Sequence, residues 1–168
     1  MRATLIVATA IPTSLVATFF ILGVFDFTLN TLTLLAMTVA IGLLVDDVIV
    51  VVEAIQRDID RGRDRVLAAS EATKRVGLAV LAGTFATLAV FVPIAFMEGI
   101  VGRFFLQYGL TIVFSVSVSL LVALTLSPML SSRFLTKENV SEGPFGRIQL
   151  FHQLIEHRYA TIIQWAIH

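Results

Sequence analysis

The feature of the sequence most suited to chemistry is a pair of adjacent acids, Asp46 and Asp47, inside the apolar run IGLLVDDVIVVVE (41–53). Apolar surroundings and mutual repulsion both favour the neutral form of a carboxylic acid. Two carboxyl groups so close together are expected to titrate as a coupled pair. Such a pair can load a proton from one side of an apolar barrier and release it to the other. Asp46 and Asp47 are therefore candidate proton-translocation residues.

The composition indicates that the apolar barrier is a lipid bilayer. The chain has 168 residues, of which 57% are hydrophobic and 14% charged, and its mean hydropathy is +0.92. Soluble proteins carry about 25% charged residues, and a small domain leaves much of its surface in water. The net charge of zero argues against a nucleic-acid partner. The absence of cysteine excludes disulfides and thiol chemistry.

Four apolar stretches are long enough to cross a bilayer as helices. They run over about 4–25, 31–52, 76–96 and 104–129. Lipid offers no partners for backbone amides, so we expect helices even where β-branched residues favour a strand locally. The predicted fold is an all-α membrane protein, with a four-helix transmembrane segment over residues 1–135.

The rest of the chain, 136–168, predicts a cytoplasmic loop, an interfacial helix and the start of a further membrane segment. From Phe145, apolar residues recur in steps of three and four, which is typical of an amphipathic helix lying in the membrane interface. A helix that packs on another protein domain is the alternative. The closing letters TIIQWAIH begin another apolar segment, so we expect the chain to be part of a longer protein.

The connectors between the apolar stretches predict the orientation. The connector 26–30 has no Lys or Arg, and the one after the third stretch has only Arg103. The middle connector carries six cationic residues: Arg57, Arg61, Arg63, Arg65, Lys74 and Arg75. Cytoplasmic loops are rich in Lys and Arg, so both ends of the segment and its middle connector are expected to be cytoplasmic.

The second stretch positions the acids, and its energetics require a partner for them. Each Asp near the bilayer centre costs about 2.5–3.5 kcal/mol, which Leu, Ile and Val offset at about 0.3–0.6 kcal/mol each. The small residues Ala36, Ala40 and Gly42 are predicted to let a neighbouring helix pack closely near the acids. An alternative, purely structural role is a bond to a Ser or Thr of that neighbour. Glu53, near the interface, is expected to be solvated or paired with Arg57.

Three other classes of protein are alternatives, and each requires a pattern that can be checked in the sequence. A receiver domain needs a polar loop after its acids, but VIVVV follows Asp47. An intramembrane aspartic protease needs acids on two helices, one of them in a GxGD setting, and only the second stretch carries a central acid. A cation channel predicts a polar stripe along the pore, for which Ser115 and Ser119 are the only candidates. The histidines His152, His157 and His168 lack metal-ligand spacing, so no metal site is expected.

Three segments resemble one known family of membrane transporters. NTLTLLAMTVAIGLLVDDVIVVVE (30–53) resembles the fourth membrane helix of resistance–nodulation–division (RND) efflux pumps. FVPIAFMEGIVGRFF (91–105) and ALTLSPML (123–130) resemble the family's fifth-to-sixth helix region, and the likeness covers nearly the whole chain in order. One departure is Ala54, where the family usually has Asn.

The resemblance implies helices three to six of a twelve-helix transporter in the bacterial inner membrane, not an enzyme. It implies that Asp46 and Asp47 carry the coupling proton, with no other cofactor. The double acid resembles the hydrophobe and multidrug branch, and a heavy-metal exporter is the alternative. A homotrimer with a periplasmic adaptor and an outer-membrane channel is also implied. The family's polar partners on helices ten and eleven and its substrate-binding periplasmic domains have no counterpart here, so we expect no transport by this chain alone.

Overall fold

The computed structural model describes residues 2–136, and every regular element within that range is a helix. The helices are α1 (Arg2–Val24), α2 (Thr31–Asp60), α3 (Arg65–Ala95), α4 (Gly99–Leu124) and α5 (Leu126–Phe134). Four segments are long and apolar enough to span a membrane: α1, α2, α3 and the continuous pair α4–α5. The predicted all-α membrane fold with four spans is confirmed. The predicted interfacial helix from Phe145 lies outside the described residues.

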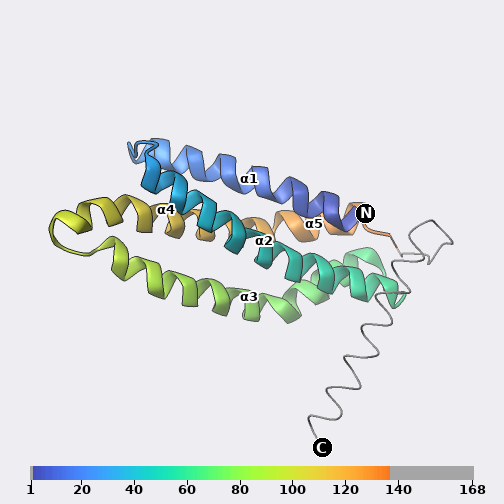
Figure 1. The fold of residues 1–168 in the computed structure, drawn as a ribbon. Helices are drawn as coiled ribbons and strands as arrows, with labels where there is room; N and C mark the ends of the chain where they lie inside the picture. The colour runs from blue at the N-terminus through green and yellow to red at the C-terminus, as the bar shows by residue number, and fades with distance from the viewer. Residues whose placement is uncertain (1, 137–168) are drawn as a thin grey trace, which may run out of the picture. The chain divides into compact units, whose positions relative to one another are not determined.

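The central elements of the bundle are α2 and the α4–α5 pair (Figure 1). Both pack against α1 and α3 as well as against each other, whereas α1 and α3 lie on opposite sides and do not touch. Short connections join the helices, so that sequential spans run antiparallel. This arrangement places α2, which carries the acid pair, in contact with every other span.

The beginning of α2 is fixed by Asn30. Its side chain accepts hydrogen bonds from the amides of Leu32 (2.9 Å) and Thr33 (3.0 Å), and the Thr33 hydroxyl accepts one from the Asn30 amide (2.8 Å). This capping box satisfies backbone donors that a helix start otherwise leaves free. A second bond, from Asn30 Nδ2 to Gln107 Oε1 (2.6 Å), ties this end of α2 to α4. The register of α2, and so the depth of its acids, is set at this end.

Both helices beside the basic connector extend past the predicted apolar stretches. α2 continues to Asp60 and α3 already begins at Arg65, so the turn between them is only 61–64. The Asp64 side chain caps α3 by accepting from the amides of Val66 and Leu67. Hydropathy measures only the part of a helix that lies in lipid, and it therefore misses the polar turns that continue the helix into water.

The two extensions are joined by the buried carboxylate of Asp58. Arg75 of α3 donates to Asp58 at 3.0 Å, and Arg63 and Arg61 of the turn lie 3.5 and 3.6 Å away. Asp58 is fully buried, while the arginines remain about half exposed. Arg63 also pairs with Glu71, so the cluster links α2, the turn and α3.

Replacing Asp58 with Ala should destabilise the chain by about 1.5–3 kcal/mol, the range for hydrogen bonds to charged groups. The partly exposed arginines keep their water, which limits the loss. The control is Glu53→Ala, because Glu53 forms the expected pair with Arg57 (2.7 Å) but both side chains are 62% exposed. That change should alter stability by less than about 1 kcal/mol. Thermal unfolding in detergent measures both, and equal losses would contradict a structural role for the Asp58 cluster.

The fourth span differs from the single helix predicted over 104–129, because it is interrupted at Thr125. Pro128 follows three residues later and has no amide to donate to the preceding turn. The Ser127 hydroxyl donates instead to the Val122 carbonyl (3.2 Å) across the break. The α5 segment then restarts the helix and packs against α1, α2 and α3.

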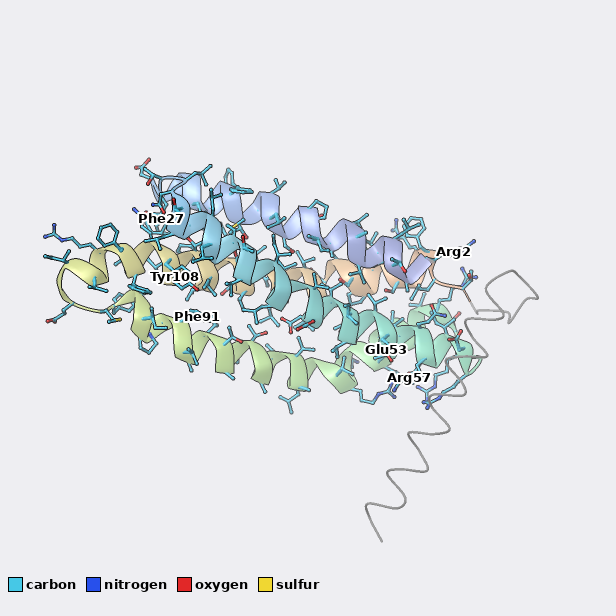
Figure 2. All side chains as sticks on the ribbon, in the orientation of Figure 1. Arg2, Phe27, Glu53, Arg57, Phe91 and Tyr108 are labelled. Carbon is cyan, nitrogen blue, oxygen red and sulfur yellow. The ribbon has the colours of Figure 1, made fainter. Side chains whose placement is uncertain are left out.

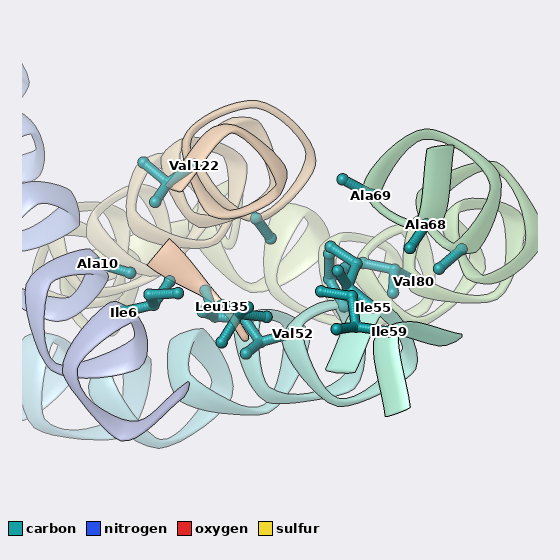
Figure 3. Close-up of a cluster of buried hydrophobic side chains, with 14 residues drawn as sticks. Ile6, Ala10, Val52, Ile55, Ile59, Ala68, Ala69, Val80, Val122 and Leu135 are labelled. Atoms are coloured by element: carbon teal, nitrogen blue, oxygen red, sulfur yellow. The ribbon is translucent and has the colours of Figure 1, made fainter. Parts of the chain in front are cut away.

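The two ends of the bundle differ in side-chain chemistry (Figure 2). Arg2, Glu53 and Arg57 lie at one end, and Phe27, Phe91 and Tyr108 lie toward the other. The charged end also holds the larger cluster of buried apolar side chains, which Figure 3 shows between the helices. Its labelled members come from α1 (Ile6, Ala10), α2 (Val52, Ile55, Ile59), α3 (Ala68, Ala69, Val80), α4 (Val122) and the residue after α5 (Leu135).

Candidate functional site

Asp46 and Asp47 lie well inside the membrane-spanning part of α2. The apolar part of the helix, 31–52, is centred near residues 41 and 42. At 1.5 Å per residue, the acids lie about 7 Å beyond that centre, toward the charged end of the bundle. Neighbouring residues on a helix point about 100° apart, and the two carboxylates accordingly differ in surroundings. Asp46 is exposed on the outer face of α2, whereas Asp47 is half-buried against α3.

Asp47 has one hydrogen-bond partner on another helix, Thr84 of α3. The Thr84 hydroxyl lies 3.2 Å from Asp47 Oδ2 and 3.0 Å from the carbonyl oxygen of Val80, one turn earlier on its own helix. Its side chain is buried, with 2% of the residue exposed. Thr84 is a site residue that sequence reasoning did not identify, although a Ser or Thr partner was weighed as the structural alternative. No pattern in the sequence distinguishes Thr84 from the other threonines of α3.

The small residues near the acids divide into two groups. Ala36 and Ala40 are fully buried, and Ala36 packs against Ile112 and Val116 at the contact between α2 and α4. At the same contact, Ser115 Oγ lies 3.7 Å from the Met37 sulfur, and Ser119 donates to the Leu44 carbonyl (3.2 Å). The bond from Ser119 to a backbone carbonyl of α2 shows that the two helices come close here, as helices with small contact residues do in membranes. Ser115 and Ser119 are used in this packing, which removes them as the pore stripe of a channel.

Gly42 does not take part in that contact. It is exposed, and a Cβ at this position would meet no atom within 4 Å. It lies instead on the same outer face as Asp46, one turn away. The exposed residues on the outer face of α2 recur in steps of three and four, as residues do along a helix face that packs on another helix. The exposed residues of the apolar part that follow this spacing include Leu35, Val39, Gly42, Asp46, Ile49, Val50 and Glu53.

The outer face of α2 has an acid and a glycine at its middle, and the described residues do not cover it. An acid facing lipid at this depth is costly, and acids in membrane helices almost always face a bundle interior or a water-filled cavity. The outer face is therefore better suited to contact with further protein than with lipid. Among residues 2–136 no cluster of three or more His or acidic side chains could hold a metal ion, and the three histidines lie outside that range.

The fold and the site together define a multi-pass helical membrane protein with an acidic pair at membrane depth. Comparison with known proteins identifies its kind: the AcrB/AcrD/AcrF family matches residues 1–168, and the chain belongs to this family of RND efflux transporters. It is 39% identical over 170 residues to the multidrug resistance protein MdtC of Photorhabdus laumondii. That match covers 99% of this chain and 16% of the relative, so the chain spans about one sixth of that protein's length.

The comparisons confirm the RND resemblance seen in the sequence. They support a multi-pass protein of the bacterial inner membrane. The family is one of transporters, which agrees with the expectation that the chain is not an enzyme. The role of the acids remains a prediction, since neither comparison addresses individual residues.

Proposed function

We propose that the chain is part of a proton-driven RND antiporter in which Asp46 and Asp47 bind and release the coupling proton. The observation that carries the proposal is the division of the pair: one carboxylate is held by another helix, and the other faces out of the bundle. The bundle supplies a partner for Asp47 alone. Asp46 would meet the remainder of the transporter on the outer face of α2, where the family's polar partner helices would pack.

The Thr84 contact supports a group that changes its protonation state. A hydroxyl has one proton to donate and lone pairs to accept with. When Asp47 is ionised, Thr84 donates to the carboxylate. When Asp47 is protonated, the acid O–H donates to Thr84, and the hydroxyl proton turns to the Val80 carbonyl, which is already in reach. Asp47 is therefore satisfied in either state without moving far, and neither state leaves a costly unpaired group.

The energy available from such a site is sufficient to bias a conformational change. One elementary charge that crosses the membrane potential is worth about 2.3 kcal/mol per 100 mV. A shift of that size alters a two-state ratio by more than tenfold. The proton would enter from the end whose connectors are poor in Lys and Arg and leave toward the basic turn, which the positive-inside rule makes cytoplasmic.

The substrate class that we propose is hydrophobic or multidrug compounds, because the MdtC relative is named a multidrug resistance protein. Substrate contacts would lie in regions outside this chain, as would a trimer interface and the surfaces for a periplasmic adaptor and an outer-membrane channel. The test is reconstitution of the full-length transporter in liposomes with an imposed pH gradient. Drug movement should follow the gradient and stop on addition of an uncoupler. Drug movement that ignores the gradient would refute proton coupling.

Gly42 provides a separate test of the outer face. In the full-length transporter, Gly42→Leu should reduce efflux by about fivefold or more, because overpacking a helix contact costs about 1–3 kcal/mol and a tenfold change is about 1.4 kcal/mol. Gly42→Ala, which adds a single methyl group, should have a much smaller effect. Drug efflux from cells with matched membrane levels of each variant measures the difference. Normal efflux with Gly42→Leu would show that no helix packs there.

A further inference from the structure

A groove between α1 and α5 opens at the charged end of the bundle. Its volume is about 730 Å³. The α1 wall carries residues in steps of three and four from Arg2 to Thr13, and the α5 wall runs from Leu126 to Phe134. The walls between the two ends are mainly aliphatic, with Leu5 on one side and Leu130 on the other. This groove lies on α1 and α5, away from the outer face of α2 and from the acid pair.

Two arginines stand at the mouth of the groove. Arg2 comes from the start of α1 and Arg133 from the last turn of α5, and Arg2 Nη1 donates to the Phe134 carbonyl at 3.3 Å. The groove lining contains no acid. Within the described part of the chain, neither arginine forms an ion pair with a carboxylate, in contrast to Arg57, Arg63 and Arg75. Two guanidinium groups therefore line the groove with no acid among the described residues to compensate them.

The depth of the groove matches one leaflet of a bilayer. Eleven residues separate Arg2 from Thr13, which corresponds to about 16 Å along a helix. Half of the hydrocarbon thickness is about 15 Å. Because α1 and the α4–α5 pair are each long and apolar enough to span a membrane, the arginines at their ends would lie at an interface and the aliphatic walls would lie beside the acyl chains. A groove with positive charge at headgroup level and apolar walls of leaflet length is complementary to one lipid molecule.

We propose that this groove is a binding site for an anionic phospholipid of the adjacent leaflet. Arg2 and Arg133 would hold the headgroup phosphate, since guanidinium groups bind phosphate through paired N–H donors. An acyl chain would lie between Leu5 and Leu130. Basic pockets between membrane helices select anionic headgroups in this way. The ligand class is a phosphodiester lipid with a net negative charge, such as phosphatidylglycerol.

The test uses the full-length protein in nanodiscs, with spin-labelled phosphatidylglycerol and spin-labelled phosphatidylcholine as the probes. The association constant of the anionic lipid with the protein should exceed that of the zwitterionic lipid by about tenfold, because the two arginines act together. The double variant Arg2→Gln, Arg133→Gln should reduce that preference to about twofold or less. The double variant Arg2→Lys, Arg133→Lys keeps both charges but loses the paired donors, so its preference should lie between those of the unsubstituted protein and the glutamine variant, which separates lost binding from lost folding.

Two further variants locate the site. Leu130→Trp should fill the groove and release the immobilised lipid while both arginines remain. The double variant Arg57→Gln, Lys74→Gln removes two charges from the same end of the bundle but outside the groove, and it should leave the preference unchanged. Equal immobilisation of the two lipids, or a preference that survives loss of Arg2 and Arg133, would overturn the proposal.

A photo-crosslinking residue introduced in place of Leu130 identifies the occupant in cells. An adduct with phospholipid is the expected product. An adduct with another segment of the transporter or with a different protein would show that protein fills the groove and would also overturn the proposal. Failure of this site would leave the proton-site proposal intact, because the two share no residue.

Discussion

Transport by the full-length protein should fall to the level of protein-free vesicles when Asp47 is replaced with Asn. The substitution keeps the size and hydrogen-bonding capacity of the side chain, and the amide can still accept from Thr84, which lies 3.2 Å from Asp47 Oδ2. It removes only the ability to gain and lose a proton. Asp46→Asn should have the same effect, because the proposed relay needs an ionisable group at both positions. Drug accumulation in inverted vesicles with an imposed pH gradient is the measurement.

The folded state should survive these changes, because neither residue carries much of the packing. Asp46 is exposed and Asp47 is half-buried. Membrane levels and thermal unfolding midpoints equal to those of the unsubstituted protein would therefore accompany the loss of transport. Persistence of pumping in the double variant Asp46→Asn, Asp47→Asn would reject the assignment outright. Passive drug leakage, measured without a gradient, supplies the baseline.

Thr84 permits a finer measurement at the same site. Thr84→Val removes the hydroxyl and keeps the branched shape, so transport should slow by about tenfold, equivalent to about 1.4 kcal/mol. Thr84→Ser keeps the hydroxyl and should retain most of the rate. The matched control is Thr87→Val, since within residues 2–136 the Thr87 hydroxyl bonds only to the Gly83 carbonyl of its own helix (3.1 Å). Equal losses at Thr84 and Thr87 would indicate a general effect of valine in α3.

The number of spans and the location of the acid pair could be predicted because they depend on composition over about 20 residues. Lipid forces such a run to be helical. The ends of α2 and α3 could not be predicted in the same way. They depend on the Asp64 cap and on the burial of Asp58 among three arginines, which are single residues acting through contacts. A count of charges in that connector predicts an orientation but not a helix.

The packing of small residues shows the same limit. Ala36, Ala40 and Gly42 were grouped because small residues allow close approach. The structure buries Ala36 and Ala40 inside the bundle and leaves Gly42 exposed on the other side of α2. The spacing explains this: steps of four keep one face of a helix, whereas a further step of two turns about 200° away. What meets Gly42 depends on protein beyond the described residues, and so its role stays a prediction.

Enlarging Gly109 of α4 should cause a large loss of stability in the bundle. This residue is buried against the last turn of α3. A Cβ there would lie 2.9 Å from the Ala95 Cβ and 3.0 Å from both the Ala95 Cα and amide nitrogen. Two of the three nearest atoms are backbone, which cannot move without shifting a helix. We expect Gly109→Leu to destabilise the chain by about 3 kcal/mol, the upper part of the range for overpacking.

The control for Gly109 is Gly83→Leu in α3, where a Cβ meets nothing within 4 Å. That substitution should be neutral or slightly stabilising, because glycine in a helix interior is about 1 kcal/mol worse than a residue such as leucine. Thermal unfolding in detergent compares the two. The pair Gly109→Ala with Ala95→Gly tests the contact itself: removing the Ala95 methyl group opens the closest of the three contacts but leaves the backbone ones. Stability should therefore be restored only in part. Unchanged stability of Gly109→Leu alone would contradict the prediction. It would mean that α3 and α4 can separate beside the buried Ala95 at no cost in free energy.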